Sequence, residues 1–113
     1  MGNGINHSDM QRFDIYLTNL DPTLGTEIKK TRPAIIISPD EMNDELATAI
    51  IAPMTTTKRH WPSRIEISFK GKDGQIALDQ IRAVDKTRLI KKIGTAQEKT
   101  CDKILKVLQE IFS

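Results

Sequence analysis

The stretch Pro33-Ala34-Ile35-Ile36-Ile37-Ser38 decides the fold, because its apolar run continues without a polar residue until Ser38. A continuous apolar run of this length is typical of a strand that is buried on both faces, whereas a half-buried strand alternates. Pro39 then closes the run. We therefore predict a strand at residues 33–38 with both of its faces covered.

Further short strands are predicted on either side of this run. Residues 13–20 have a period of two, and residues 64–69 alternate cleanly, which points Ile65 inward and Arg64 outward. The other predicted strands are Ala47–Ala52, Gln75–Ile81 and a short one at Leu89–Ile93. The acidic residues 40–45 are expected to form an exposed turn or a single helical turn.

An amphipathic helix is predicted at the end of the chain. Thr95 and Glu98 have the spacing of a capping box, and apolar side chains then recur at helical spacing. These apolar residues are Cys101, Ile104, Leu105, Leu108, Ile111 and Phe112. Five or six short strands and one terminal helix, without βαβ alternation, predict a mainly β (α+β) fold. We expect a small β-barrel or curled sheet with the helix packed against it.

The length and composition favour one domain in a reducing compartment. A chain of 113 residues has the size of a single core. We expect residues 1–11 to be a flexible tail and residues 12–113 to form the domain. The single cysteine, Cys101, permits no internal disulfide, and no stretch approaches the ~20 apolar residues of a membrane span. We therefore expect a cytoplasmic protein without a membrane partner.

Several classes of site are unsupported by the sequence. Two histidines and one cysteine are too few soft ligands for a structural zinc site. The acidic residues 40–45 are better explained as a solvated turn than as a magnesium site. No GxGxxG, P-loop or GxSxG motif occurs, so nucleotide-cofactor and α/β-hydrolase chemistry have no basis. We predict neither a metal nor a cofactor.

Positive charge is concentrated in two polar loops, although the formal net charge is only +2. Lys29, Lys30 and Arg32 lie at the end of the first loop, at residues 21–31. The second loop, at residues 54–63, carries Lys58, Arg59 and His60, with Arg64 just after it. Side by side, the loops would form a basic cleft for phosphates; alternatively, they are ordinary solvated loops. Trp61 could stack on an unpaired base or act as a hydrophobic lid.

Short motifs along the chain resemble the MazF/PemK toxin family in order and spacing. The resemblance covers residues 12 to 94, and six motifs with compatible gaps make coincidence improbable. The motifs are Phe13-Asp14-Ile15-Tyr16-Leu17 through Leu20-Asp21-Pro22-Thr23, Gly25-Thr26-Glu27, Thr31-Arg32-Pro33-Ala34, Ile37-Ser38-Pro39, Ala52-Pro53-Met54-Thr55-Thr56 and Asp79-Gln80-Ile81-Arg82.

The resemblance implies a fold, an activity and partners. The implied fold is an SH3-like small barrel of the MazF/CcdB toxin type. The implied function is that of the toxin of a type II toxin–antitoxin system, a homodimeric mRNA interferase that is neutralised by a MazE/PemI-like antitoxin. Family members cleave single-stranded RNA at short sequences without a metal, by 2′-hydroxyl attack that leaves 2′,3′-cyclic phosphate and 5′-hydroxyl ends. Arg32 and Thr55 occupy the positions of the family's catalytic arginine and threonine.

The general base has three candidates. Some relatives use an aspartate at the Asp-Gln step, which is Asp79 here, although this carboxylate could instead pair with Arg82. Glu27 on the first loop is a second candidate. His60 has a suitable side chain but lies outside the matched motifs. Relatives of the Kid type carry an arginine two residues before the aspartate, where this chain has Ala77, so a proton role of that arginine cannot be transferred.

The expected RNA contacts follow from the two loops and the Asp-Gln motif. They are Lys29, Lys30, Thr56, Lys58, Arg59, His60, Trp61, Gln80 and Arg82. A CcdB-like gyrase inhibitor is a weaker alternative, because the chain ends in Glu110-Ile111-Phe112-Ser113 and not in Trp-Gly-Ile. A non-catalytic RNA-binding domain is the other alternative. The sequence does not predict the RNA recognition site or the identity of the antitoxin.

Overall fold

The computed structural model describes residues 10–20 and 31–113, so Glu27, Lys29 and Lys30 lie outside the described residues. The strands are β1 (Asp14–Asn19), β2 (Thr31–Ile36), β3 (Thr48–Thr55), β4 (Arg64–Phe69), β5 (Lys72–Ala77), β6 (Arg82–Asp85) and β7 (Leu89–Thr95). The helices are α1 (Asp40–Glu45) and α2 (Glu98–Ile111), with single 3-10 turns η2 (Leu78–Gln80) and η3 (Lys86–Arg88).

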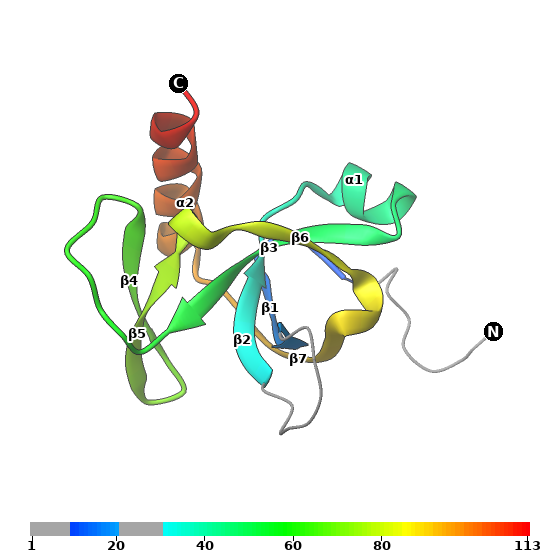
Figure 1. Cartoon of the computed structure of the whole chain (residues 1–113), viewed down its shortest axis with the longest axis horizontal. Coiled ribbons are helices and arrows are strands. Elements are labelled where there is room, and N and C mark those ends of the chain that lie inside the picture. The colour runs from blue at the N-terminus through cyan, green and yellow to red at the C-terminus, as the bar shows by residue number, and fades with distance from the viewer. Residues whose placement is uncertain (1–9, 21–30) are drawn as a thin grey trace.

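The strands form one strongly curled antiparallel sheet, with α2 packed on one side of it (Figure 1). The strand order is β4-β5-β3-β2-β1-β7, and β6 pairs with β3 beside that path. The long strand β3 pairs with β6 through residues 48–51 and with β5 through Met54 and Thr55. Because the first half of β3 pairs with β6 and its last residues pair with β5, the sheet bends along β3. The predicted mainly β fold with a terminal helix is confirmed.

Two apolar cores cover the two faces of the central strands. Ile15 and Ile35 are directly paired across β1 and β2 and lie in the core beneath α2, where Ile104 of the helix is fully buried. The next pair, Tyr16 and Ala34, lies in a second core on the opposite face. The prediction that the 33–38 stretch is buried on both faces is therefore confirmed, as expected for a continuous apolar run.

The bounds of the strands differ from the predicted ones for identifiable reasons. The strand predicted at 33–38 begins at Thr31 and ends at Ile36, after which the amides of Ile37 and Ser38 both donate to the carbonyl of Ile50. The buried Asn43 of α1 binds Ser38 and anchors the predicted acidic turn. β3 continues to Thr55, so the second loop begins at residue 56.

Two local predictions were wrong. The strand predicted at 75–81 ends at Ala77, where η2 redirects the chain so that the unpredicted strand β6 can pair with the beginning of β3. The predicted capping box does not form, because Thr95 ends β7 and its hydroxyl donates to Asp14, 3.1 Å away. The N-cap of α2 is Gln97, without a side-chain cap.

No helix in the described part of the chain is long and apolar enough to cross a membrane.

Candidate active site at the ends of β2 and β3

The two predicted catalytic residues lie at the same end of neighbouring strands. Ala34 of β2 pairs with Pro53 of β3, and the strands are antiparallel. Arg32 lies two residues before Ala34 and Thr55 lies two residues after Pro53, so both are displaced from this pair in the same direction. Arg32 is exposed and Thr55 is half-buried. Both side chains are thus held by the sheet and remain accessible to a substrate.

The hydroxyl of Thr55 starts the turn into the second loop. Its oxygen accepts a hydrogen bond from the backbone N–H of Thr57, 3.1 Å away. Such a bond between residues two apart stabilises a turn and fixes the hydroxyl. The O–H group of Thr55 therefore remains able to donate. Gly74 lets β5 approach closely here, because a side chain at that position would lie 2.7 Å from the carbonyl oxygen of Thr55.

The loop of residues 56–63 is tied to the sheet by Gln75, which is almost completely buried. The side-chain oxygen accepts from the backbone N–H of Arg59, 3.0 Å away, and from Arg64, 3.3 Å away. The side-chain nitrogen donates to the carbonyl of Arg59 at 3.1 Å and to Glu66 at 2.7 Å. All four hydrogen bonds available to a glutamine amide are therefore made inside the protein.

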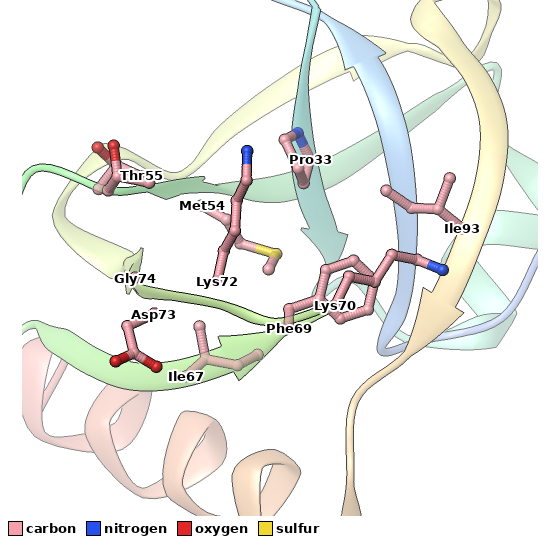
Figure 2. A pocket seen from close by; sticks show the side chains of 11 residues that line it. Pro33, Met54, Thr55, Ile67, Phe69, Lys70, Lys72, Asp73, Gly74 and Ile93 are labelled. Carbon is pink, nitrogen blue, oxygen red and sulfur yellow. The ribbon is translucent and has the colours of Figure 1, made fainter.

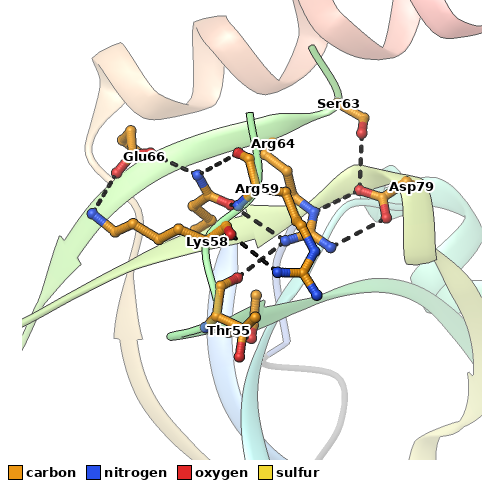
Figure 3. A network of polar contacts seen from close by, with 9 residues as sticks. Thr55, Lys58, Arg59, Ser63, Arg64, Glu66 and Asp79 are labelled. Carbon is orange, nitrogen blue, oxygen red and sulfur yellow. Dashed lines mark hydrogen bonds and ion pairs between the residues drawn. The ribbon is translucent and has the colours of Figure 1, made fainter. Parts of the chain in front are cut away.

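Arg64 is the centre of the polar network in Figure 3. Its Nε donates to Oδ1 of Asp79 at 2.8 Å, and Nη2 donates to Oδ2 at 3.4 Å. Nη1 donates to the carbonyl oxygen of Thr57 at 3.2 Å. The Arg64 side chain is only 4% exposed. The alternation along β4 correctly predicted that the Arg64 side chain points away from that of Ile65. The expected exposure of Arg64 was wrong, because the loop of residues 56–63 folds over its side chain.

Asp79 is held by Arg64 and by Ser63, whose hydroxyl donates to Oδ1 at 2.9 Å. Partial burial tends to raise the pKa of Asp79, but the hydrogen bonds from Arg64 and Ser63 outweigh it and place the pKa below the ordinary aspartate value. The sequence had also suggested an ion pair between Asp79 and Arg82. Arg82 instead donates to the carbonyl oxygen of Leu20, 3.2 Å away.

The exposed surface of the loop carries the remaining groups expected to contact RNA. Lys58 forms an ion pair with Glu66 at 2.9 Å, and the hydrogen bonds from Gln75 and then Lys58 hold the pKa of Glu66 below its usual value. Trp61 is 47% exposed, and the centroid of its ring lies 4.8 Å from the guanidinium carbon of Arg64. Trp61 thus lies against Arg64 and is also partly open to solvent, which is compatible with both roles predicted for it, base stacking and a hydrophobic lid.

The structure brings some predicted residues together and leaves others apart. Thr55, Thr56, Lys58, Arg59, His60 and Trp61 lie at the end of β3 and in the loop after it. Asp79 joins them through Arg64. Gln80 and Arg82 are exposed on η2 and β6. Among residues 10–20 and 31–113, no cluster of three or more His, Cys, Asp or Glu side chains could hold a metal ion.

Sequence reasoning missed Gln75 as a site residue and did not place Arg64 in the site. The signal lay in the register of the β4–β5 hairpin, which pairs Arg64 with Ala77 and Glu66 with Gln75. In that register Arg64 lies opposite the last residue of β5, two residues before Asp79. A hairpin turn at Lys70-Gly71 gives this pairing, but the loop that closes over Arg64 is not visible in the alternation.

Comparison with known families shows to which family the chain belongs. The model of the PemK-like, MazF-like toxins of type II toxin–antitoxin systems matches residues 11–112. The chain belongs to this family. Its membership confirms the predicted class, a toxin endoribonuclease of a toxin–antitoxin system.

Curated relatives of the family carry names of the same class. Endoribonuclease EndoA of Bacillus subtilis (strain 168) is 36% identical over 106 residues, which cover 88% of this chain and 91% of the relative. Endoribonuclease MazF of Staphylococcus saprophyticus is 38% identical over 96 residues, covering 80% of each chain. These relatives are matched over most of their own length.

Solved structures of the family have the same fold. MazF from Deinococcus radiodurans matches with a TM-score of 0.74 and 20% identity, over 90% of this chain and 94% of that one. A mycobacterial endoribonuclease in complex with its cognate antitoxin matches with a TM-score of 0.77 and 22% identity, over 90% and 93%. At these identities the likeness establishes the fold alone.

Proposed function

We propose that this chain is a sequence-specific, metal-independent endoribonuclease that cuts single-stranded messenger RNA in the cytoplasm. In the proposed reaction the ribose 2′-hydroxyl attacks the adjacent phosphorus, the bond to the 5′-oxygen breaks, and the products carry 2′,3′-cyclic phosphate and 5′-hydroxyl ends. The observation that carries the proposal is the accessible pair formed by Arg32 and Thr55 at the ends of two hydrogen-bonded strands of a toxin-family chain.

An internal nucleophile explains how such a site could work without a metal. The 2′-hydroxyl is tethered beside the phosphorus, so no metal-bound water has to be generated. The remaining tasks are stabilisation of the negative charge that develops on phosphorus and transfer of two protons. The guanidinium of Arg32 offers a planar pair of donors that matches phosphate oxygens. The fixed hydroxyl of Thr55 adds a neutral donor to the same group.

We assign Asp79 to positioning and not to proton transfer. Both of its oxygens accept hydrogen bonds from Arg64, and its pKa is lowered, so it is a weak base near neutral pH. Arg64 also binds the carbonyl of Thr57, whose N–H binds the hydroxyl of Thr55. Arg64 and Asp79 thus support Thr55 through the turn. Glu27, outside the described residues, stays the candidate for the base.

Arg64 also accounts for one departure from the family pattern. The arginine expected two residues before the aspartate in Kid-type relatives is Ala77 here. Arg64 is paired with Ala77 on the neighbouring strand, and its guanidinium reaches Asp79. We propose that the guanidinium beside this aspartate is supplied from β4 in this chain. Because it is almost buried, its role is to hold the loop and not to contact the phosphate.

The loop surface provides groups for binding the RNA strand. Arg59 and Lys58 are exposed cations suited to phosphates, and the partly open ring of Trp61 is suited to stacking on a base. Thr56, His60, Gln80 and Arg82 are exposed and could contact flanking nucleotides. Lys29 and Lys30 are assigned to the same strand of RNA on the basis of the sequence.

We further propose a homodimer that is neutralised by a MazE/PemI-like antitoxin. Exposed apolar side chains in the second half of α2 and directly after it, namely Leu105, Ile111 and Phe112, support an interface with a second copy. An acidic and apolar antitoxin segment would complement the basic loop at residues 56–63. The first test is incubation of the purified chain with a long single-stranded RNA. Discrete cleavage sites would support the proposal, and an RNA that stays intact would refute it.

A further inference from the structure

A pocket of about 330 Å³ adjoins the candidate active site and has no part in the function proposed above (Figure 2). It lies between the β4–β5 hairpin and the neighbouring strands β2, β3 and β7. Its floor is apolar and includes Met54, Ile67 and Ile93, and Phe69 forms one wall. Ligand pockets in proteins begin at about 300 Å³ and combine such floors with a few placed polar groups.

The pocket is built into the fold. Phe69 of β4 packs on the bare backbone of Gly94 in β7, where a side chain would lie 2.7 Å from the ring carbon Cε1. This contact joins two strands that are far apart in the order of the sheet. The aromatic wall is therefore held by the sheet and not by a loop. The ammonium group of Lys70 lies over the Phe69 ring, 5.5 Å from its centroid, so an aromatic ligand would contact the remaining surface of the ring.

The polar rim of the pocket connects it to the proposed chemistry. Thr55 and Thr56 line one side, so an occupant lies next to the candidate catalytic hydroxyl. In Figure 2 the ammonium group of Lys72 points toward the side on which Thr55 and Pro33 lie, while the carboxylate of Asp73 points away from it. No ion pair of Lys72 is present within the described parts of the chain.

We propose that this pocket receives one unpaired nucleobase of the RNA next to the cut, and that Lys72 binds an adjacent phosphate. The inference rests on the proposed endoribonuclease function and adds a base subsite to it. A nucleotide combines a flat apolar ring with a neighbouring anion, which matches an apolar floor that has an aromatic wall and a cationic rim. Because Thr55 is shared, the bound base would align its own phosphodiester with the reacting groups.

The test uses a cycle of two changes, one in the protein and one in the RNA. After the cleavage sites in a long RNA have been mapped, an oligonucleotide around one site is made with 2′-hydrogen at the cut, so that binding is measured without cleavage. Each nucleotide within three positions of the cut is replaced in turn by an abasic one. Fluorescence anisotropy then gives the affinity for the parent chain and for Ile67→Phe, which fills the pocket.

One abasic position should weaken binding to the parent on the order of 10-fold, as expected for loss of a stacked base. The same replacement should cost less than about two-fold in Ile67→Phe, because the pocket is already closed to the base. Equal losses in both proteins at every position would overturn the proposal. A parent that neither binds nor cuts RNA would instead refute the proposed function itself, and the base subsite with it.

Lys72→Met provides a second variant that leaves the apolar floor unchanged. Loss of one phosphate contact should reduce the slope of log affinity against log salt by about 0.7 for a single strand. Lys106→Met removes the same charge from an exposed position on α2 and should leave the slope unchanged. Equal slopes in the parent and Lys72→Met would contradict the phosphate role, even if Ile67→Phe misfolded.

Discussion

Arg64 on β4 and Asp79 in η2 form a two-point contact, with Nε of the guanidinium 2.8 Å from one carboxylate oxygen and Nη2 3.4 Å from the other. The same guanidinium binds the carbonyl of Thr57, 3.2 Å away. One cation with an almost buried side chain therefore joins β4, η2 and the turn that carries Thr55. This arrangement connects the stability of the loop with the geometry of the candidate active site.

Arg64→Ala and Asp79→Ala should lower activity in a non-additive way. Each variant removes the same link to the turn at Thr55, so the double variant should lose little more than the worse single variant. Both should mainly reduce kcat, because neither residue offers a free group to the RNA. Single-turnover cleavage of one oligonucleotide by the four proteins measures this, and losses that multiply would show independent roles.

The free energy of unfolding should depend on pH through Asp79. The folded pKa of Asp79 is lowered, so its stabilising contribution is present above the ordinary aspartate pKa of about 3.9 and is lost as the pH falls through the folded value. Urea unfolding between pH 7 and the acid limit should show this loss. In Asp79→Asn the loss should be smaller, and an identical acid profile in both proteins would argue against the contact.

Gln75→Leu should loosen the loop at residues 56–63 while leaving the apolar cores intact. The substitution removes four hydrogen bonds and leaves the Arg59 amide without its partner, which should cost about 1–3 kcal/mol. Hydrogen exchange of the Arg59 amide should accelerate and cleavage should slow. Gln97→Leu, at the exposed N-cap position of α2 where the side chain makes no capping hydrogen bond, is the matched control. Unchanged exchange at Arg59 would show that Gln75 does not hold the loop.

Arg32→Ala and Thr55→Ala should remove most activity and leave the fold stable, since both lie at strand ends outside the two apolar cores. Loss of one preorganised donor to a developing anion costs roughly 10²–10³ in rate, and Arg32→Ala should be the worse of the two. Arg32→Lys should recover little, because lysine lacks the planar pair of donors. Thermal melts and cleavage rates decide this, and parent-like rates would refute the catalytic assignment.

Strands with strong apolar patterns could be predicted from the sequence, and those that depend on distant partners could not. β1 and β2 could be predicted because their apolar side chains fill the two cores, as Ile15 and Ile35 do in the core beneath α2. β6 has only one buried side chain, Val84, and exists because β3 offers it a free edge. Likewise Thr95 has the spacing of a cap, but tertiary contact with Asp14 uses its hydroxyl instead.

The candidate site shows the same division. Arg32, Thr55 and Asp79 could be proposed from the sequence, because the motifs that resemble the family are short runs of consecutive residues. The burial of Arg64 could not, because alternation along β4 places it correctly away from Ile65 but does not reveal the loop that covers it. The apolar pocket at the β4–β5 hairpin is also a tertiary feature, since Phe69 and Gly94 meet only in the folded sheet.

The most direct test of the account compares two oligonucleotides that differ only at the ribose 5′ of a mapped cut, one with 2′-hydroxyl and the other with 2′-hydrogen. Both are incubated with the chain in excess EDTA, and the products are identified by mass spectrometry. We predict that only the hydroxyl substrate is cut, at the rate seen without EDTA, and that its 5′ fragment ends in a 2′,3′-cyclic phosphate. Cutting of both substrates at the same rate, or loss of cutting in EDTA that Mg²⁺ restores, would contradict the proposed mechanism.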